Sequence, residues 1–450
     1  MRLAKKLGIA LTVVATIAAV LLIAPVGGLI KTGKQISFRP SGDGATPVWL
    51  IAGPFQDTGD NALFADCLWW VGGEGGAKAR DGGIAGRRWH SLVRWQQVTP
   101  AEDGVIDFAK IWPLRYHSVA YAYTEIESDS DRELVATIGS GTYIQVWLNG
   151  RVIFEDRLLR HFNPDRDALV LPLHKGTNTV LVKALEMAED LWRMQWQTRI
   201  PSGRLFVNQT RTMVPDFIVG ETQGAWGQVE VANASREPAT GVVAEVVGDE
   251  MTRPSHSEPV RIEPGEMQRI PVWIASRGPA PEKAPGPIRL KVSSGSEACS
   301  AEFTPRIRNK DQYFGTTFRS AIDGSVQPYS VWLPSNFNPK TTYPLIVMLH
   351  GDTVTDWWQN IFAYSQKSWA ILAAPGGRGD NSFRDIGEKD LDQMISLVAG
   401  KYHIDRDRLY LSGHSDGGYG VWYQATRRPY LWSSVSAQAA ATDAYFQRPD

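Results

Sequence analysis

The stretch Arg408-Leu-Tyr-Leu-Ser-Gly-His-Ser-Asp-Gly-Gly-Tyr-Gly420 decides the fold of the carboxyl-terminal part of this chain. It begins as an apolar, strand-like run, and residues 421–428 after it can form a helix. Between the two, Gly413-x-Ser415-x-Gly417 matches a sharp strand-to-helix turn with a serine at the bend. A side chain at either glycine would collide with the neighbouring backbone in so tight a turn. We therefore expect Ser415 to stand exposed at the carboxyl edge of a sheet.

The residues around this turn indicate alternating strands and helices. Residues 316–333 read as a hairpin, and the apolar runs 343–349 and 369–374 are typical of strands buried on both faces of a sheet. Residues 388–402 form an amphipathic pattern with one apolar helical face. Strands that alternate with helices indicate a parallel sheet, so we predict an α/β domain over residues 309–450.

The preceding residues carry a different pattern, of many short strands with turn signals. Over 47–202 no long amphipathic helix is visible, and Asn149-Gly150 accepts the positive φ angles of a tight hairpin turn. Residues 203–308 show strands of similar length and a proline-rich loop. We expect a multidomain chain, with two β-sandwich domains followed by the α/β domain; the second sandwich would be immunoglobulin-like and serve as a spacer or pack against the mouth of the α/β domain.

The amino terminus predicts export. Three basic residues within the first six precede the uncharged run 7–30, which is long enough to cross a bilayer as a helix. Residues 1–31 are therefore expected to be either a removed signal peptide or, as we favour, an uncleaved transmembrane anchor with its basic end in the cytoplasm. A polar linker, 32–46, would follow. The rest of the protein would lie on the extracytoplasmic side or be secreted.

Charge and cysteine content exclude some classes of partner. Lys and Arg number 47 against 48 Asp and Glu, so the chain lacks the basic footprint of a nucleic-acid-binding protein. Cys67 and Cys299 lie far apart in sequence and in different expected domains, so we expect no disulfide between them. The sequence contains no zinc-protease motif, phosphate loop or dinucleotide fingerprint, and we expect no metal and no cofactor.

Acyl transfer by a serine requires a nucleophile, a general base, a group that orients the base, and donors to the developing oxyanion. Ser415 is the candidate nucleophile, and the backbone N–H of Asp416 is a candidate oxyanion donor at the start of the next helix. A second N–H is expected from Asp352 or Thr353, where Gly351 lets the backbone approach the substrate. These roles need no particular side chain, so the side chain of Asp416 is expected to be a bystander.

The base and the acid are harder to place. In this type of fold both follow the nucleophile in the chain, and no histidine follows Ser415. Asp443 sits where an acid is sometimes found, but a turn residue is the plainer interpretation. His414 should point away from the serine, His350 is expected to be structural, and His403 is expected on the far side of the sheet. None of these histidines suffices as a base.

Three segments carry a resemblance to a known family: Ser320–Pro334, Tyr343–Gly351 and Asp405–Gly420. They resemble exported α/β hydrolases grouped with prolyl oligopeptidases and with polyhydroxyalkanoate-depolymerase or feruloyl-type esterases. The likeness runs from about 316 to 438 and implies a Ser-Asp-His triad in that chain order, with Ser415 as the nucleophile. Thr353, the second residue after the His350-Gly351 pair, and Asp416 depart from the usual pattern of the family, which blurs the substrate class but not the reaction type.

The first expected sandwich also resembles a known module. Its strand residues are similar to the galactose-binding-like jelly rolls of bacterial exported hydrolases, at Trp49–Phe55, Ala120–Glu125, Val146–Gly150 and Asn178–Lys183. Such modules often bind carbohydrate or act as spacers. Several tryptophans are candidates for stacking on sugar rings, although core packing is the plainer role: Trp69, Trp70, Trp89, Trp95 and Trp112. Trp357 and Trp358 are candidates for lining a substrate pocket in the α/β domain.

Two hypotheses follow. The first is an exported serine hydrolase, an esterase or a peptidase, that forms an acyl-enzyme on Ser415; with no triad acid or histidine, this chain would be the front part of a longer hydrolase and inactive alone. The second is a non-catalytic, surface-anchored carbohydrate-binding protein with a degenerate hydrolase module. The sequence does not determine the substrate or the oligomeric state.

Overall fold

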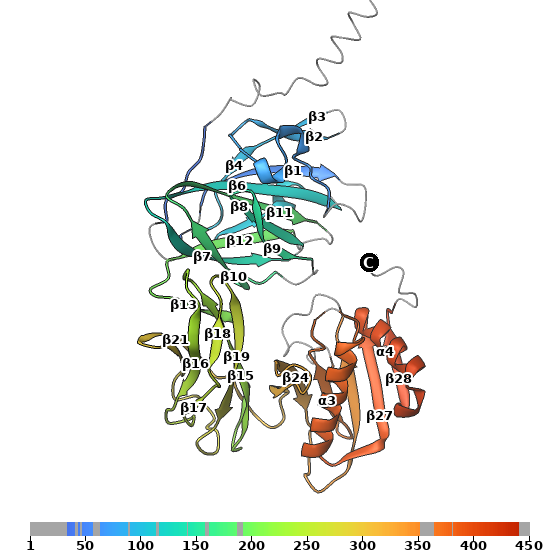
Figure 1. Cartoon of the computed structure of the whole chain (residues 1–450). Coiled ribbons are helices and arrows are strands. Elements are labelled where there is room, and N and C mark those ends of the chain that lie inside the picture. Colours follow the sequence, from blue (N-terminus) through green and yellow to red (C-terminus); the bar gives the residue numbers. More distant parts are fainter. Residues whose placement is uncertain are drawn as a thin grey trace, which may run out of the picture.

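The computed structural model describes residues 34–40, 44–45, 47–56, 64–88, 91–113, 117–141, 143–157, 162–186, 192–351, 364–379 and 381–440. The fold is dominated by strands, which form several sheets, and helices are few (Figure 1). Across these described ranges no helix has the length and apolar character to span a membrane. The predicted anchor or signal peptide, 1–31, lies outside them.

Two sheets pack face to face in the first part of the chain. The six-stranded sheet contains, in spatial order, β4 (Gln96–Val98), β1 (Trp49–Gln56), β6 (Ser118–Ser128), β11 (Gly176–Leu185), β8 (Ile144–Leu148) and β9 (Arg151–Asp156). The four-stranded sheet contains β10 (Asp167–Leu173), β7 (Arg132–Ser140), β12 (Arg193–Arg199) and β5 (Val105–Asp107). Buried side chains from both sheets form one core, which includes Trp49, Ile138 and Trp196.

Short strands and helical turns complete this part of the chain. They are η1 (Trp69–Val71), η2 (Glu74–Gly76), β2 (Ile84–Arg88), β3 (Ser91–Arg94) and α2 (Phe108–Ile111).

The hairpin between β8 and β9 turns at Asn149 and Gly150, which have φ angles of 52° and 77°. The positive φ angles expected from this dipeptide are thus present.

The second part of the chain is also built from strands, around a separate apolar core. One sheet contains β13 (Leu205–Met213), β15 (Gly224–Asn233) and β19 (Met267–Ala275). The other contains β17 (Ser255–His256), β16 (Ala239–Val247), β20 (Ile288–Ser294) and β21 (Glu297–Phe303), with β18 (Val260–Ile262) beside β16. A short parallel pair, β14 (Phe217–Ile218) and β22 (Ile307–Arg308), leads toward the last part.

The last part is a mixed six-stranded sheet with helices. Its order is β23 (Phe314–Arg319), β24 (Val326–Trp332), β26 (Ile371–Pro375), β25 (Tyr343–Leu349), β27 (Ile404–His414) and β28 (Ser434–Gln438). The last four run parallel, and β24 pairs antiparallel with β26 on one side and with the edge strand β23 on the other. The helical elements are α3 (Ile386–Lys401), α4 (Asp416–Arg427) and η4 (Pro429–Leu431). From β26 to β28, strands alternate with helices along the parallel strands of this sheet.

A buried joint connects the second and last parts. Asp216, whose side chain is fully buried, forms ion pairs with Arg306 and Arg308 and accepts a hydrogen bond of 2.8 Å from the N–H of Gly315. Ile218 belongs to the same apolar core as the strands of the last sheet. The second part therefore packs at the β23 edge, and the strand that carries the serine turn, β27, lies further along the sheet.

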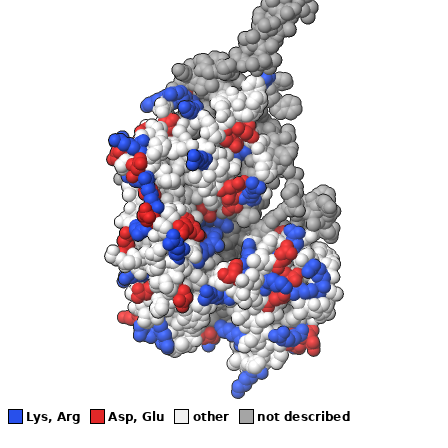
Figure 2. Space-filling view, viewed as in Figure 1, with Lys and Arg blue, Asp and Glu red and all other residues white. Residues whose placement is uncertain are grey.

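Charged side chains are interspersed over the visible face of the molecule, with blue and red patches side by side (Figure 2). Within the part of the chain that the structure describes, Cys67 and Cys299 are not joined by a disulfide.

Candidate active site

Ser415 lies at the sharp turn between β27 and α4. Its φ and ψ angles are 55° and −119°, a conformation that non-glycine residues rarely adopt. The residue is half-buried, and its N–H donates to the carbonyl of Gln438 in the neighbouring strand at 2.9 Å. Such backbone strain persists only where the surroundings impose it, and it is concentrated at functional sites.

The glycines of the motif are required by close backbone contacts. A Cβ added at Gly413 would lie 2.3 Å from the carbonyl oxygen of Gly417. One added at Gly417 would lie 2.3 Å from the oxygen of Leu349 and 2.4 Å from that of His350. The turn is therefore packed directly on the end of β25, and a side chain at either glycine would push the serine out of place.

The end of β25 approaches Ser415 from the other side. A Cβ built on Gly351 would lie 3.3 Å from the Cβ of Ser415, so this glycine contacts the serine. The ring of His350 is directed at two carbonyl oxygens, with Nδ1 2.9 Å from that of Gly351 and Nε2 3.2 Å from that of Gly376. The predicted oxyanion residues Asp352 and Thr353, and the predicted pocket residues Trp357 and Trp358, lie outside the described residues.

The remaining triad candidates are not brought into a catalytic arrangement in the described part of the chain. His414 is exposed beside the serine, and His403 precedes β27 at the opposite end of that strand. Asp443 lies outside the described residues. The amides of Asp416 and Gly417 lie in the first turn of α4, where backbone N–H groups have no acceptor within the helix and can donate to an anion.

The side chain of Asp416 differs from the expectation that it is a bystander. It is buried, with 5% of its surface exposed. Its carboxylate accepts a hydrogen bond of 3.2 Å from the N–H of Ser382 and another from the Ser382 hydroxyl. Sequence reasoning missed this contact because Ser382 lies 34 residues earlier, in a loop without a recognisable motif.

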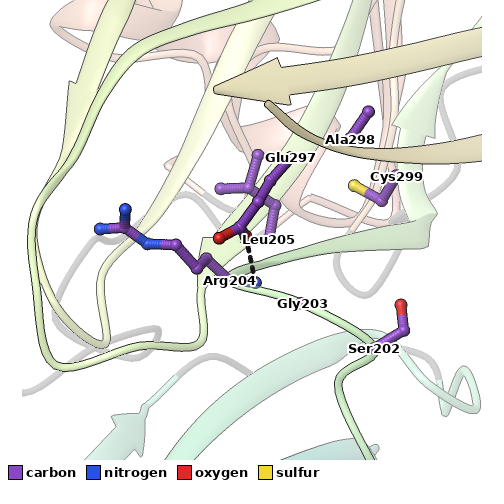
Figure 3. A pocket seen from close by; sticks show the side chains of 7 residues that line it. All are labelled: Ser202, Gly203, Arg204, Leu205, Glu297, Ala298 and Cys299. Carbon is purple, nitrogen blue, oxygen red and sulfur yellow. Dashed lines mark hydrogen bonds between the residues drawn. The ribbon is translucent and has the colours of Figure 1, made fainter. Parts of the chain in front are cut away.

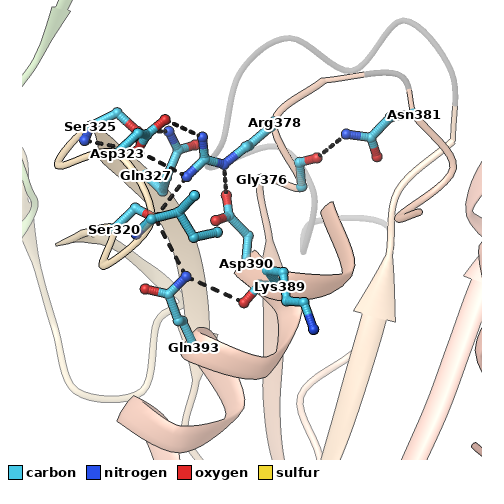
Figure 4. A network of polar contacts seen from close by, with 12 residues as sticks. Ser320, Asp323, Ser325, Gln327, Gly376, Arg378, Asn381, Lys389, Asp390 and Gln393 are labelled. Carbon is cyan, nitrogen blue, oxygen red and sulfur yellow. Dashed lines mark hydrogen bonds and ion pairs between the residues drawn. The ribbon is translucent and has the colours of Figure 1, made fainter. Parts of the chain in front are cut away.

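A polar network holds the outer end of that loop (Figure 4). Arg378 pairs with Asp323 in the β23–β24 turn at 2.6 Å and with Asp390 on α3 at 2.8 Å, and it donates to the Ser320 hydroxyl. Hydrogen bonds from Arg378 hold the pKa of Asp323 well below its usual range, whereas burial raises the pKa of Asp390. The loop after β26 is thus fastened both to the hairpin and to α3.

A cavity of about 350 Å³ lies elsewhere, in the second part of the chain (Figure 3). It is lined by Ser202, Gly203, Arg204, Leu205, Glu297, Ala298 and Cys299. The Glu297 carboxylate accepts a hydrogen bond from the N–H of Arg204 at 2.9 Å, and burial raises the pKa of the Cys299 thiol to about 11. None of the lining residues belongs to the α/β part, so this cavity is separate from the serine turn.

The candidate sugar-stacking tryptophans of the first part have different surroundings. Trp95 and Trp112 pack in or against the apolar cores. Trp69 is 63% exposed and packs against Trp70 with ring centroids 4.5 Å apart. Trp89 lies outside the described residues. In the described ranges no group of three or more His, Cys, Asp or Glu residues is placed to hold a metal ion.

Comparison with known proteins gives esterases and other serine hydrolases. No protein-family model matches the chain. A bifunctional acetylxylan esterase/xylanase of Neocallimastix patriciarum is 30% identical over 108 residues, which are 22% of this chain and only 16% of that enzyme. A thermostable esterase structure is 16% identical with a TM-score of 0.26, and the match covers 51% of this chain and 78% of that one. A ferulic acid esterase structure from Anaeromyces mucronatus is 19% identical with a TM-score of 0.24, over 29% and 59% of the two chains.

Proposed function

We propose that this protein is a serine hydrolase that cleaves esters through an acyl-enzyme on Ser415. The strained turn at Ser415, between a central parallel strand and a helix, carries the proposal. It presents the serine beside the first amides of α4 and against Gly351, the arrangement that a nucleophile and its oxyanion donors require. The esterases to which the chain is similar support the same class of reaction.

The bond cleaved is proposed to be an ester rather than a peptide bond. The sequence similarity to an acetylxylan esterase/xylanase favours a small acyl group on a polysaccharide as the substrate class. The match covers only 16% of that enzyme, so this substrate class is carried over to the chain as part of the proposal. The proposal also includes export of the protein. It further assigns a galactose-binding-like fold to the first strand-rich part and an immunoglobulin-like fold to the second.

Labelling by a fluorophosphonate probe tests the nucleophile. The full-length gene product should be labelled at Ser415, and Ser415→Ala should abolish the labelling because no other hydroxyl occupies the turn. Ser396→Ala is the matched control, since Ser396 is an exposed serine on α3 outside the site. Two outcomes would contradict the proposal: a Ser415→Ala variant that is labelled as strongly as the wild type, or a folded wild type that is not labelled at all.

The second candidate is a non-catalytic glycan-binding protein. One observation favours it: the exposed ring of Trp69 packs against Trp70 at an interplanar angle of 40°, and exposed indole rings can stack on sugar rings. Glycan-array binding that is lost in Trp69→Ala, together with a folded protein that the probe does not label, would support this candidate over the hydrolase.

A further inference from the structure

One face of α4 lies along the loop that follows β26. Asp416, Gly420 and Gln424 are spaced four residues apart and therefore share a face of the helix. Asp416 accepts from the N–H and hydroxyl of Ser382, and the Gln424 side-chain amide donates to the carbonyl of Phe383 at 3.0 Å. A Cβ added at Gly420 would lie 2.8 Å from the carbonyl oxygen of Ser382. The loop is thus in direct contact with the helix over two turns.

The part of the loop in this contact is strained. Ser382 and Phe383 have φ angles of 54° and 55°, in the left-handed region that non-glycine residues avoid. Both residues are buried. Because such a conformation persists only where other contacts hold it, the hydrogen bonds to Asp416 and from Gln424 help to fix these two residues, together with the bond from the Phe383 N–H to the Asn381 side chain.

Phe383 connects this loop to the residues that follow β25, on the other side of Ser415. Its ring packs edge-on against the ring of His350, with centroids 4.9 Å apart. His350 is also within hydrogen-bond distance of the carbonyl oxygens of Gly351 and Gly376. Gly351, in turn, contacts Ser415. A closed chain of contacts therefore runs from Asp416 through the loop to the end of β25 and back to the serine.

We infer that the Asp416 carboxylate is a positioning residue for the oxyanion site. It acts through Ser382, Phe383 and His350 to set the distance between the first amides of α4 and Gly351, which contacts Ser415. The inference rests on the proposed function, because the two arms matter only if an oxyanion forms between them. Misplacing one arm lowers stabilisation of the transition state and leaves ground-state binding almost unchanged.

Steady-state hydrolysis of p-nitrophenyl acetate by the full-length gene product tests this inference. Asp416→Ala should lower kcat about 10- to 100-fold with KM changed by less than about 3-fold, as expected for a small misplacement of catalytic groups. Asp416→Asn keeps an oxygen that accepts from Ser382 and should retain most of kcat. Asp407→Ala, an exposed aspartate on β27, is the matched control and should behave as the wild type.

Two further measurements separate positioning from general stability. Hydrogen exchange at the Ser382 amide should accelerate in Asp416→Ala and not in Asp407→Ala, because the amide loses its acceptor. Ser382→Ala combined with Asp416→Ala should lower kcat no more than Asp416→Ala alone, since the two residues act through one contact.

The outcomes distinguish this inference from the proposed function. A folded Asp416→Ala variant with unchanged kcat, or fully additive losses in the double variant, would overturn the inference while the proposed function stands. A folded wild type that neither hydrolyses the ester nor reacts with a fluorophosphonate would overturn both.

Discussion

Two buried aspartates of this molecule are held in opposite ways. Asp216, at the joint between the second part and the α/β sheet, is surrounded by the guanidinium groups of Arg306 and Arg308 and the N–H of Gly315. Asp416, beside the candidate nucleophile, accepts hydrogen bonds from the N–H and hydroxyl of Ser382, and among the described residues it forms no ion pair.

The difference follows from what each region has to do. The contacts of Asp216 serve a structural role only, so two cations can neutralise its carboxylate. Direct ion pairing then offsets the cost of desolvating these charges. Beside the serine, a fixed cation next to Asp416 would alter the electrostatics where negative charge develops, whereas neutral donors and the amino end of α4 stabilise the carboxylate without one. The comparison predicts that removing the Asp216 carboxylate lowers stability without changing the reactivity of Ser415, whereas removing the Asp416 carboxylate lowers that reactivity.

The largest effect is expected from breaking the serine turn itself. Gly417→Ala places a Cβ 2.3 Å from the oxygen of Leu349, a backbone atom that cannot move aside. The unfolding free energy of the α/β part should fall by about 4 kcal/mol or more, measured by denaturant unfolding. Gly400→Ala is the control, because Gly400 is exposed on α3 with open space around it, and the substitution should be neutral or slightly stabilising. Equal stability of the two variants would contradict the tight turn.

Removal of the carboxylate at the joint should have the next largest effect. Asp216→Ala leaves two arginines without their partner and should lower the unfolding free energy by about 3 kcal/mol. In the fraction that remains folded, the rate of fluorophosphonate labelling at Ser415 should not change. Asp405→Ala removes an exposed ion pair with Arg408 and should lower the unfolding free energy far less, because water screens exposed ion pairs. A labelling rate that falls with Asp216→Ala would mean that the two regions are coupled.

The smallest of the three effects is a pH dependence that belongs to the joint. Burial raises the pKa of Tyr329 to about 12, and Tyr329 shares its apolar core with Ile218. The folded protein therefore disfavours the ionised phenol, so the contribution of Tyr329 to stability is present below about pH 10 and is lost as pH rises from 10 to 12. Between these values the wild type should lose about 2 kcal/mol more than Tyr329→Phe, followed by alkaline denaturation. Parallel pH curves for the two proteins would exclude this assignment.

Local chemistry allowed much of the fold to be predicted from the sequence. The serine turn follows from the sterics of Gly413 and Gly417, and the apolar run Tyr343–Leu349 forms the central strand β25. The helix expected at 388–402 spans Ile386–Lys401. Strand β13, Leu205–Met213, was not predicted because its polar residues do not alternate cleanly and its pairing with β15 shifts register.

The contacts that hold the candidate site were not predictable in the same way. Asp416 and Ser382 are 34 residues apart, and Asp216 and Arg306 are 90 residues apart. Neither pair belongs to a motif with fixed spacing, since each depends on how separate elements pack. The sequence therefore predicted the position of the serine but not the buried polar contacts that fix its surroundings.

The joint also bears on how the protein is assembled during synthesis. A ribosome makes the chain from its amino end, so Asp216 and Ile218 emerge before the first strand of the α/β sheet, β23, exists. When Phe314 and Gly315 appear, an acceptor for the Gly315 amide and an apolar surface for Phe314 are already available. Strand β23 can therefore pack against Asp216 and Ile218 as soon as it is synthesised, because these residues were translated earlier.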